Sequence, residues 1–283
     1  MPPNLKSSNP DIAVRPEKIE DLLKSSFRTM ALYEYFTDMK RPLNIGEIAS
    51  GINIPQSSAS TMVKSLLDSG YLEKDMQSRT YRPSLRTLML NDWIKKDNEK
   101  TLTLIDAIPT LCAQIDETVI LAKRNNIYSQ YVYVAHTKSH NEAHDFQYVQ
   151  TGSLRPLVCS ATGWALLSHT SEDEIGKLIR RTMNETENDY WKSTAKSALE
   201  NIRTAKEKGY AYSSGPSAKG TSGIAITLQT DTTISEYVLG VAGSSAEIKE
   251  KKTFILTQIM TFLRTQNWKC SYNMFDVSAY DSD

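Results

Sequence analysis

Residues 44–71, NIGEIASGINIPQSSASTMVKSLLDSGY, decide the fold of the first part of this chain. Asn44 and Glu47 have the spacing of a capping box, which begins a short helix. That helix is expected to end near Gly51, a residue suited to the left-handed conformation after a helix. Pro55 fits the first turn of a second helix, whose apolar residues recur at helical spacing. Two short helices joined by a tight turn predict a helix-turn-helix.

The second helix of this pair opens with small polar side chains. In a helix-turn-helix, this end of the second helix enters the DNA major groove, where Gln can contact adenine and Ser or Thr can contact either base. Capping chemistry without any ligand is the alternative, because many helices start with Ser. The candidate DNA-binding residues on the two helices are Asn44, Gln56, Ser57, Ser58, Ser60, Thr61 and Lys64.

A β-hairpin is predicted directly after the second helix. Its strands are Tyr71–Asp75 and Arg79–Pro83. A hairpin in this position is the wing of a winged helix, and its basic side chains are placed to meet the phosphate backbone. Those side chains are Lys74, Arg79 and Arg82.

These elements resemble the winged-helix domain of IclR-type transcriptional regulators. The matching segments are RPLNIGEIASGINIPQSSASTMVKSLLDSGYLEKD, over residues 41–75, and RTYRPS, over residues 79–84. Regulators of this family often carry Arg in the second helix where this chain has Thr61. This departure concerns the base preference and not the domain.

Helices are also predicted on both sides of this domain. One runs from Ile19 to about Thr37 and packs behind the helix-turn-helix. Arg28 within it is a further candidate contact to phosphate, with a solvated surface arginine as the alternative. The other is capped by Ser84 and runs to about Ile94. In the family this helix joins the two domains and helps dimerisation, so the resemblance implies a homodimer or a dimer of dimers.

Two later segments resemble the C-terminal domain of the same family. They are GSLRPLVCSATGWALLS, over residues 152–168, and GYAYSSGPSAKGTSGIAITL, over residues 209–228. The resemblance implies an effector bound between the strands of that domain and the helix that starts at Ser160. Carried over position by position, the effector-binding residues are Ser160, Ala161, Thr162, Gly163, Ser213, Thr221, Gly223, Gly240 and Ala242.

The residues at this helix start bear on the kind of effector. The free backbone N–H groups of a helix that opens with small residues can receive a carboxylate, although a tightly packed helix start needs small residues equally. Several family members hold Cys or Ser at Gly223, Gly240 and Ala242, and Lys at Trp164. Residues smaller and less polar than Cys or Ser leave more apolar space in the pocket. We therefore expect the effector to be a small organic acid with a bulkier or aromatic side group.

The order of elements after residue 100 predicts the fold of the second domain. Helices, then strands, then helices, without regular βαβ alternation, indicate an α+β domain around an antiparallel sheet. The resemblance makes it a GAF-like sensor domain. The expected helices are Leu102–Ile115, broken at Pro109, Glu172–Arg181, Ser193–Lys208 and Ala246–Thr265.

The 283 residues are long enough for two domains. We expect a disordered arm over 1–18, the winged helix-turn-helix over 19–83, a linker helix over 84–100, the effector-binding domain over 101–270 and a tail over 271–283. Residues 1–96 hold 14 Lys and Arg against 11 Asp and Glu, a modest excess for a DNA-binding domain. Three widely spaced cysteines and no apolar leader or membrane span favour the cytoplasm.

Other functional classes find less support in the residues. No G-x-S-x-G motif, phosphate-binding glycine loop or catalytic Cys or His context is present, so we expect neither an enzyme nor a cofactor. His136, His140 and His144 could line a metal site on a helix, but a polar loop is the preferred reading, and no metal is expected. The remaining alternative is a winged helix used for protein contacts, with a sensor-like domain that has no ligand.

Overall fold

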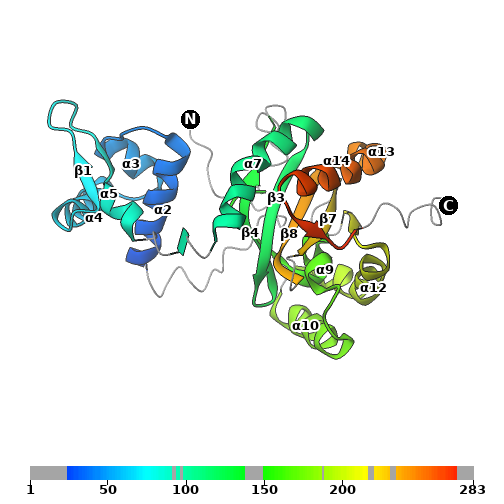
Figure 1. Ribbon diagram of the computed structural model, residues 1–283. Coiled ribbons are helices and arrows are strands. Elements are labelled where there is room, and N and C mark those ends of the chain that lie inside the picture. The colour runs from blue at the N-terminus through cyan, green and yellow to red at the C-terminus, as the bar shows by residue number, and fades with distance from the viewer. Residues whose placement is uncertain are drawn as a thin grey trace. The chain divides into compact units, whose positions relative to one another are not determined.

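The computed structural model of this chain describes residues 24–90, 94–95, 98–137, 149–186, 188–215, 220–229 and 234–272. The chain divides between Leu102 and Thr103 into two compact units, which are described separately below (Figure 1). None of the helices in the described ranges combines the length and the apolar character that a membrane crossing needs.

The N-terminal unit is the predicted winged helix-turn-helix. Three helices are followed by a two-stranded antiparallel hairpin and a short helix. They are α2 (Lys24–Met39), α3 (Ile45–Gly51), α4 (Gln56–Asp68), β1 (Leu72–Lys74), β2 (Tyr81–Pro83) and α5 (Leu85–Met89).

One small core holds this unit together. The three larger helices and β1 each supply at least one buried apolar side chain: Leu32 from α2, Ile48 from α3, Val63 from α4 and Leu72 from β1. Because α3 and α4 each turn one apolar stripe to this core, the opposite stripe of each faces solvent. The burial pattern therefore determines which side chains of α4 are exposed to solvent.

The capping box predicted for α3 is present. The Asn44 side-chain oxygen accepts a hydrogen bond from the Glu47 backbone N–H at 3.0 Å, and the Glu47 carboxylate accepts one from the Asn44 N–H at 2.9 Å. We expect Asn44→Ala to lower the free energy of unfolding by about 1 kcal/mol, measured by urea unfolding of the full chain. Glu34→Ala, at an exposed position of α2, is the control and should change it by less than about 0.5 kcal/mol.

The turn between α3 and α4 differs in detail from the prediction. The left-handed residue is Asn53, with φ of 53°, and Gly51 is the last residue of α3. A Cβ atom on Gly51 would lie 2.2 Å from Cζ of Tyr35, so this glycine allows α3 to approach the tyrosine ring. Pro55 directly precedes α4 as its N-cap and does not occupy the first turn.

The C-terminal unit is built on an antiparallel sheet, as predicted. Its strand order is β5-β4-β3-β8-β7-β6, and β9 also pairs with β7. The strands are β3 (Thr118–Asn125), β4 (Tyr128–Ala135), β5 (Leu154–Pro156), β6 (Ala211–Ser214), β7 (Thr221–Gln229), β8 (Ile234–Ser244) and β9 (Lys269–Cys270).

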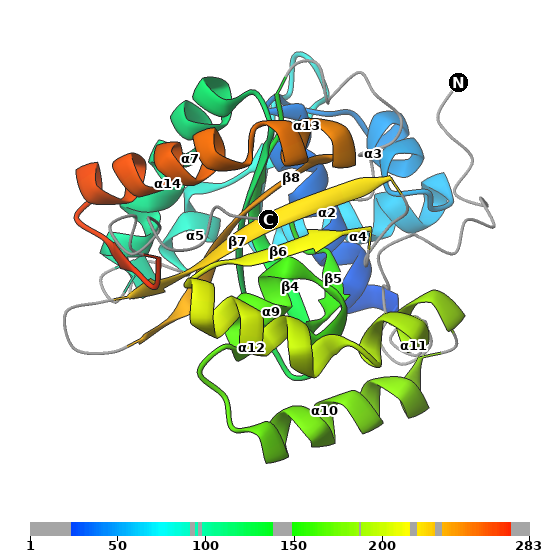
Figure 2. The ribbon, with the colours of Figure 1, turned by 90° about the vertical axis from the view of Figure 1, so that its right-hand side faces the viewer.

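Helices cover both faces of this sheet (Figure 2). Alternation along β3 shows the two layers, since Ile120 and Ala122 pack into one core and Val119 and Leu121 into the other. The first core lies under α9 (Ala161–Leu167), α10 (Glu172–Glu185), α11 (Asp189–Ala195) and α12 (Ala198–Lys208). The second lies under α7 (Glu99–Ile115), α13 (Ser245–Glu250) and α14 (Lys252–Thr265).

Four predictions about helices are wrong. The helix expected from Ser84 to about Ile94 ends at Met89 as α5, and the Ser84 side chain does not cap it, because its hydroxyl donates to the Gly70 carbonyl. Pro109 does not break its helix, because α7 buries an apolar face through Leu104, Ile108 and Leu111, and this burial offsets the hydrogen bond that proline removes. The segment predicted as one helix from Ser193 forms α11 and α12, and the closing helix forms α13 and α14. The break between α13 and α14 falls at Lys251, whose Nζ donates a hydrogen bond to the Glu117 carboxylate.

Candidate functional site

The outward face of α4 carries five of the eleven candidate DNA-binding residues. Ala59 and Val63 are buried in the core, which fixes the rotation of this helix. The exposed side chains of the predicted set on this helix are Gln56, Ser57, Ser60, Thr61 and Lys64.

Three other candidates lie apart from that face. Ser58 and Arg28 are half-buried, and both line a groove of about 490 Å³ between α4 and α2. The Asn44 side chain caps α3, so its oxygen is engaged within the protein. Arg28 therefore lies beside the exposed face of α4 and not on it.

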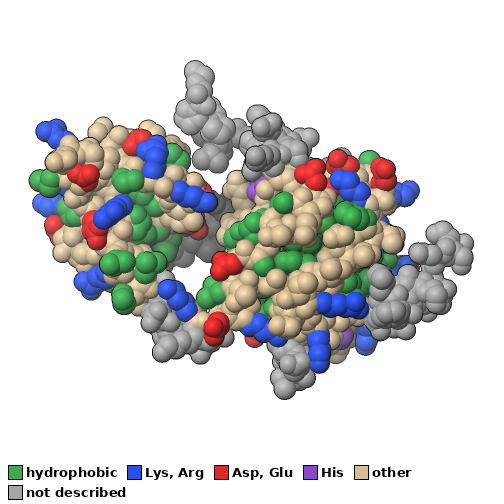
Figure 3. Space-filling view, turned by 45° about the horizontal axis from the view of Figure 1, so that its top comes forward, with side chains coloured by type: hydrophobic (Ala, Val, Ile, Leu, Met, Phe, Trp, Pro, Cys, Tyr) green, Lys and Arg blue, Asp and Glu red, His purple; other side chains and the backbone are tan. Residues whose placement is uncertain are grey.

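The wing carries its three basic side chains in different settings. Arg82 pairs with Glu73 across the hairpin at 3.0 Å, and both side chains are largely exposed. The Lys74 ammonium lies 5.8 Å from the centre of the Tyr81 ring. Arg79 has a φ of 54° between the two strands. On the face of this unit that Figure 3 shows, Lys and Arg side chains are scattered, and hydrophobic groups are exposed among them.

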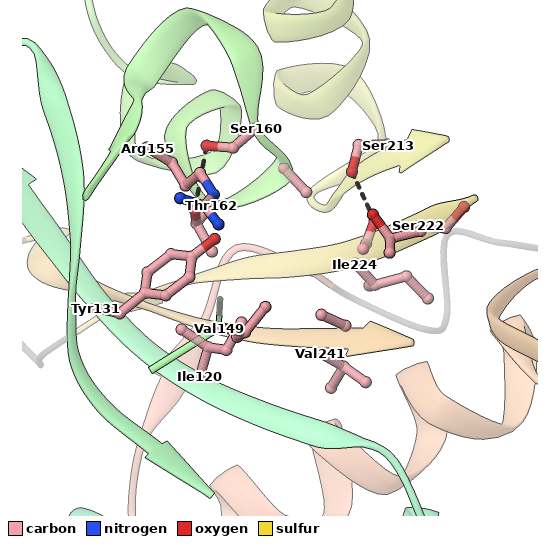
Figure 4. A pocket seen from close by; sticks show the side chains of 14 residues that line it. Ile120, Tyr131, Val149, Arg155, Ser160, Thr162, Ser213, Ser222, Ile224 and Val241 are labelled. Atoms are coloured by element: carbon pink, nitrogen blue, oxygen red, sulfur yellow. Dashed lines mark hydrogen bonds between the residues drawn. The ribbon is translucent and has the colours of Figure 1, made fainter. Parts of the chain in front are cut away.

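A small cavity of about 50 Å³ opens in the C-terminal unit between α9 and the strands (Figure 4). Seven of the nine predicted effector-binding residues line it. They are Ser160, Ala161, Thr162, Ser213, Thr221, Gly223 and Ala242. The full lining comes from β3, β4, β5, β6, β7, β8, Val149 and the start of α9.

The other two predicted residues, Gly163 and Gly240, do not line the cavity. A Cβ atom on Gly163 would lie 2.0 Å from the carbonyl oxygen of Leu157, and one on Gly240 would lie 2.9 Å from Cγ2 of Thr162. Both glycines allow α9 to pack closely on its neighbours, so tight packing explains them. The sequence predicts that small residues at positions 223, 240 and 242 widen the cavity. Of these, only Gly223 and Ala242 line it, so Gly240 cannot contribute to this effect.

Hydroxyl groups form a short chain at the start of α9. Ser129 Oγ donates to Thr162 Oγ1 at 2.9 Å, and Ser160 Oγ lies 3.3 Å from the same atom. Ser160 Oγ also accepts the Gly163 N–H at 3.1 Å as the N-cap of α9. Trp164 is buried and donates its indole N–H to the Val158 carbonyl at 2.9 Å, so it serves packing and lies outside the lining.

The sequence analysis missed Arg155 and Tyr131, which both line the cavity. Arg155 lies on β5 with 1% of its surface exposed, and its Nη1 donates to the Leu154 carbonyl at 3.2 Å. Burial raises the pKa of the Tyr131 phenol, against the opposing effects of Arg155 and of a hydrogen bond with Thr162, so the phenol stays protonated at neutral pH. A single arginine within the apolar run of residues 154–159 was the available signal.

The histidines do not form a metal site within the described residues. His136 Nδ1 lies 3.1 Å from Thr118 Oγ1, whereas His140 and His144 lie outside the described residues. Across the described ranges, no three His, Cys, Asp or Glu side chains converge as metal ligands would.

The chemistry of the cavity favours an anion. Among the described residues that line it, Arg155 is the only charged one, and its guanidinium is built for carboxylate recognition. Tyr131, Ser160, Ser213 and Ser222 add hydroxyl groups to the lining, and of these Tyr131 and Ser160 lie on the Arg155 side (Figure 4). The remaining walls are apolar or small.

Two family models match the chain. Residues 27–76 match the IclR helix-turn-helix domain, and residues 106–267 match the bacterial transcriptional regulator IclR C-terminal domain. Among curated proteins, the chain is similar to the HTH-type transcriptional regulator KipR of Bacillus subtilis (strain 168), with 26% identity over 159 residues. The match covers 56% of this chain and spans 61% of the length of KipR.

Solved structures share the fold. An IclR transcriptional regulator from Alicyclobacillus acidocaldarius matches with a TM-score of 0.53 and 18% identity, covering 86% of this chain and 95% of the other. An IclR homolog from Microbacterium hydrocarbonoxydans, solved in complex with 4-hydroxybenzoate, matches with a TM-score of 0.51 and 17% identity, covering 85% and 99%.

Proposed function

Because this chain belongs to the IclR family of bacterial transcriptional regulators, and so is a DNA-binding regulator and not an enzyme, we propose that a small organic acid bound beside Arg155 controls its binding to an operator. The buried guanidinium in the cavity is the observation that carries this proposal. A regulator of this kind acts in the cytoplasm, where its DNA lies.

The geometry of the cavity supports a carboxylate as the recognised group. Arginine presents its N–H donors in a planar fork that matches the two oxygens of a carboxylate. The protonated phenol of Tyr131, on the Arg155 side, and the Ser213 hydroxyl, across the cavity, add hydrogen-bonding groups to the lining (Figure 4). A keto or hydroxy substituent next to the carboxylate would meet these groups.

The cavity volume bears on the size of the acid. A volume of about 50 Å³ exceeds the roughly 10–15 Å³ that one water needs, so a short-chain acid fits without rearrangement. An aromatic acid such as the 4-hydroxybenzoate bound by the Microbacterium homolog would require the lining to move. Both classes therefore belong in the ligand screen.

We expect at least one acid of such a screen to raise the melting temperature of the wild-type protein, and Arg155→Met to abolish that shift. A ligand at about 100 times its dissociation constant stabilises the native state by roughly 2.7 kcal/mol, which a thermal-shift assay detects readily. The matched control is Arg264→Met, which removes an exposed arginine from α14 of the same domain and should leave the shift intact.

A second variant guards against a fold defect in Arg155→Met. Ala242 lines the cavity and is half-exposed, so Ala242→Leu fills the space without removing a buried charge. We expect this variant to keep the melting temperature of the free protein and to lose the acid-induced shift. A full shift in both Arg155→Met and Ala242→Leu would show that the acid binds elsewhere.

The acid and the operator should influence each other through the populations of two states. An effector changes DNA affinity only if it binds the two states with different affinity, and the DNA must then change effector affinity by the same factor. Isothermal titration of the acid into free and operator-bound protein would measure this reciprocity. If the acid binds free and operator-bound protein with equal affinity, then acid binding does not control DNA binding.

We propose that the chain binds DNA as a homodimer. The short helix α5 leaves four large apolar side chains exposed, and such a cluster is unusual on the surface of a monomer. They are Leu85, Leu88, Met89 and Leu90, with 71%, 59%, 72% and 52% of their surfaces exposed. A second copy of the chain covers them most simply, because two recognition helices then match the two half-sites of a near-palindromic operator.

A further inference from the structure

The base-reading face of α4 contains no arginine, and this restricts the DNA sequence that it can read. The residues exposed on the first two turns are Gln56, Ser57, Ser60 and Thr61. Lys64, in the third turn, is the only cation of the helix. We propose, resting on the proposed function, that the base pairs contacted by α4 are A·T pairs and that no arginine–guanine contact contributes to the half-site.

Strong guanine recognition usually relies on an arginine or lysine at the base edges, and the first two turns of α4 have neither. In the major groove guanine presents two acceptors, N7 and O6, and the usual reader is Arg or Lys with two parallel N–H donors. The N-terminal end of a recognition helix reaches the base edges, while later turns run out towards the backbone. Lys64 is therefore placed for phosphate, and the first two turns offer only amide and hydroxyl groups.

Adenine and thymine match the groups that are present. The Gln56 side chain is exposed and carries one acceptor and one donor group, which is the pattern that pairs with N6 and N7 of adenine. The Gln56 position opens the helix, where the approach to base edges is closest.

The Thr61 hydroxyl is restricted by the helix itself. Its Oγ1 donates to the Ser57 carbonyl at 3.0 Å, so the hydroxyl proton is engaged and the oxygen remains as an acceptor. An acceptor is unsuited to N7 and O6 of guanine, whereas the Thr61 methyl group can contact the thymine methyl. The Thr61 side chain thus favours thymine over guanine.

Arg28 is an arginine of another element that lies beside α4. It lies on α2, half-buried, and lines the groove beside α4 together with Ser58 and Met62, which are also half-buried. This position suits a contact to the phosphate backbone that flanks the bases. Its replacement is therefore part of the test.

The test is in vitro selection of a randomised DNA duplex library by the full-length protein at fixed salt concentration. We expect each enriched half-site to contain adenine at the position whose preference is lost in Gln56→Ala, with a loss of discrimination of roughly 5- to 150-fold. Thr61→Arg should create a preference for guanine at one further position, and this preference should be of similar size. The control Lys64→Ala should weaken binding equally for all sequences and reduce the salt slope by about one.

The outcomes separate this inference from the proposed function. Guanine at the position read by Gln56, or a guanine whose enrichment is lost in Arg28→Ala, would overturn A·T readout while DNA binding stands. An unaltered base preference in Thr61→Arg would also overturn it, because residue 61 would then not face a base. If no duplex is enriched and binding does not depend on salt, the proposed function itself fails.

Discussion

Replacing Lys251 by methionine is expected to lower the free energy of unfolding by about 3 kcal/mol. Glu117 follows α7 and is fully buried, and its Oε1 lies 3.0 Å from Nζ of Lys251. Removing one partner of a buried ion pair leaves the other charge in a medium of low dielectric constant, which destabilises proteins by roughly 3–5 kcal/mol. Because 34% of the Lys251 side chain is exposed, we expect the lower end of that range.

Urea unfolding of the full chain measures this change. Lys249→Met removes an exposed lysine two residues earlier and should change stability by less than about 0.5 kcal/mol. Adding Glu117→Gln to Lys251→Met removes the buried charge and should recover part of the loss. If the single variant Lys251→Met unfolds at the same urea concentration as the wild type, the pair does not stabilise the fold.

The same pair predicts a dependence on pH. The hydrogen bond to Glu117 raises the pKa of Lys251 above its ordinary value. A raised pKa of a cation in the folded state means that its stabilisation is complete below the ordinary lysine pKa of about 10.4 and is lost as pH rises through the folded-state pKa. The stability difference between wild type and Lys251→Met should therefore be constant near neutral pH and shrink in alkaline solution.

Gly163→Ala is the second variant with a large expected effect. The new Cβ atom would lie 2.0 Å from the Leu157 carbonyl oxygen, which is a backbone atom and cannot rotate away. The start of α9 must then move from residues 157–159, and overpacking of this kind destabilises by about 3 kcal/mol. Since Ser160 and Thr162, at the start of α9, line the cavity, effector affinity should fall as well.

Gly176→Ala provides a matched control of opposite sign. Gly176 lies inside α10, where a Cβ atom would meet nothing closer than Nη1 of Arg180 at 3.6 Å. Alanine is preferred to glycine in a helix interior by roughly 0.8–1.0 kcal/mol, so this variant should be more stable than the wild type. A stable Gly163→Ala protein with unchanged effector affinity would show that α9 tolerates the displacement.

Local signals in the sequence determined the N-terminal unit well. The capping pair of Asn44 and Glu47, the apolar stripe of α4 and the hairpin that follows act over three to ten residues, and tertiary packing agrees with them. The order of motifs along the chain gave the family, and through it the antiparallel α+β domain. Seven of the nine predicted effector-binding residues line one cavity for the same reason.

Tertiary structure decided what no local pattern encodes. Arg155 and Tyr131 reach the cavity because β4 and β5 pair in one particular register, which brings together residues that are distant in sequence. The close approach of α9 to residues 157–159 requires Gly163, and the bond between Lys251 and Glu117, 134 residues apart, accompanies the break between α13 and α14. A residue type and its neighbours in the chain set helices, caps and turns, whereas the side chains that meet across a sheet depend on which strands become neighbours.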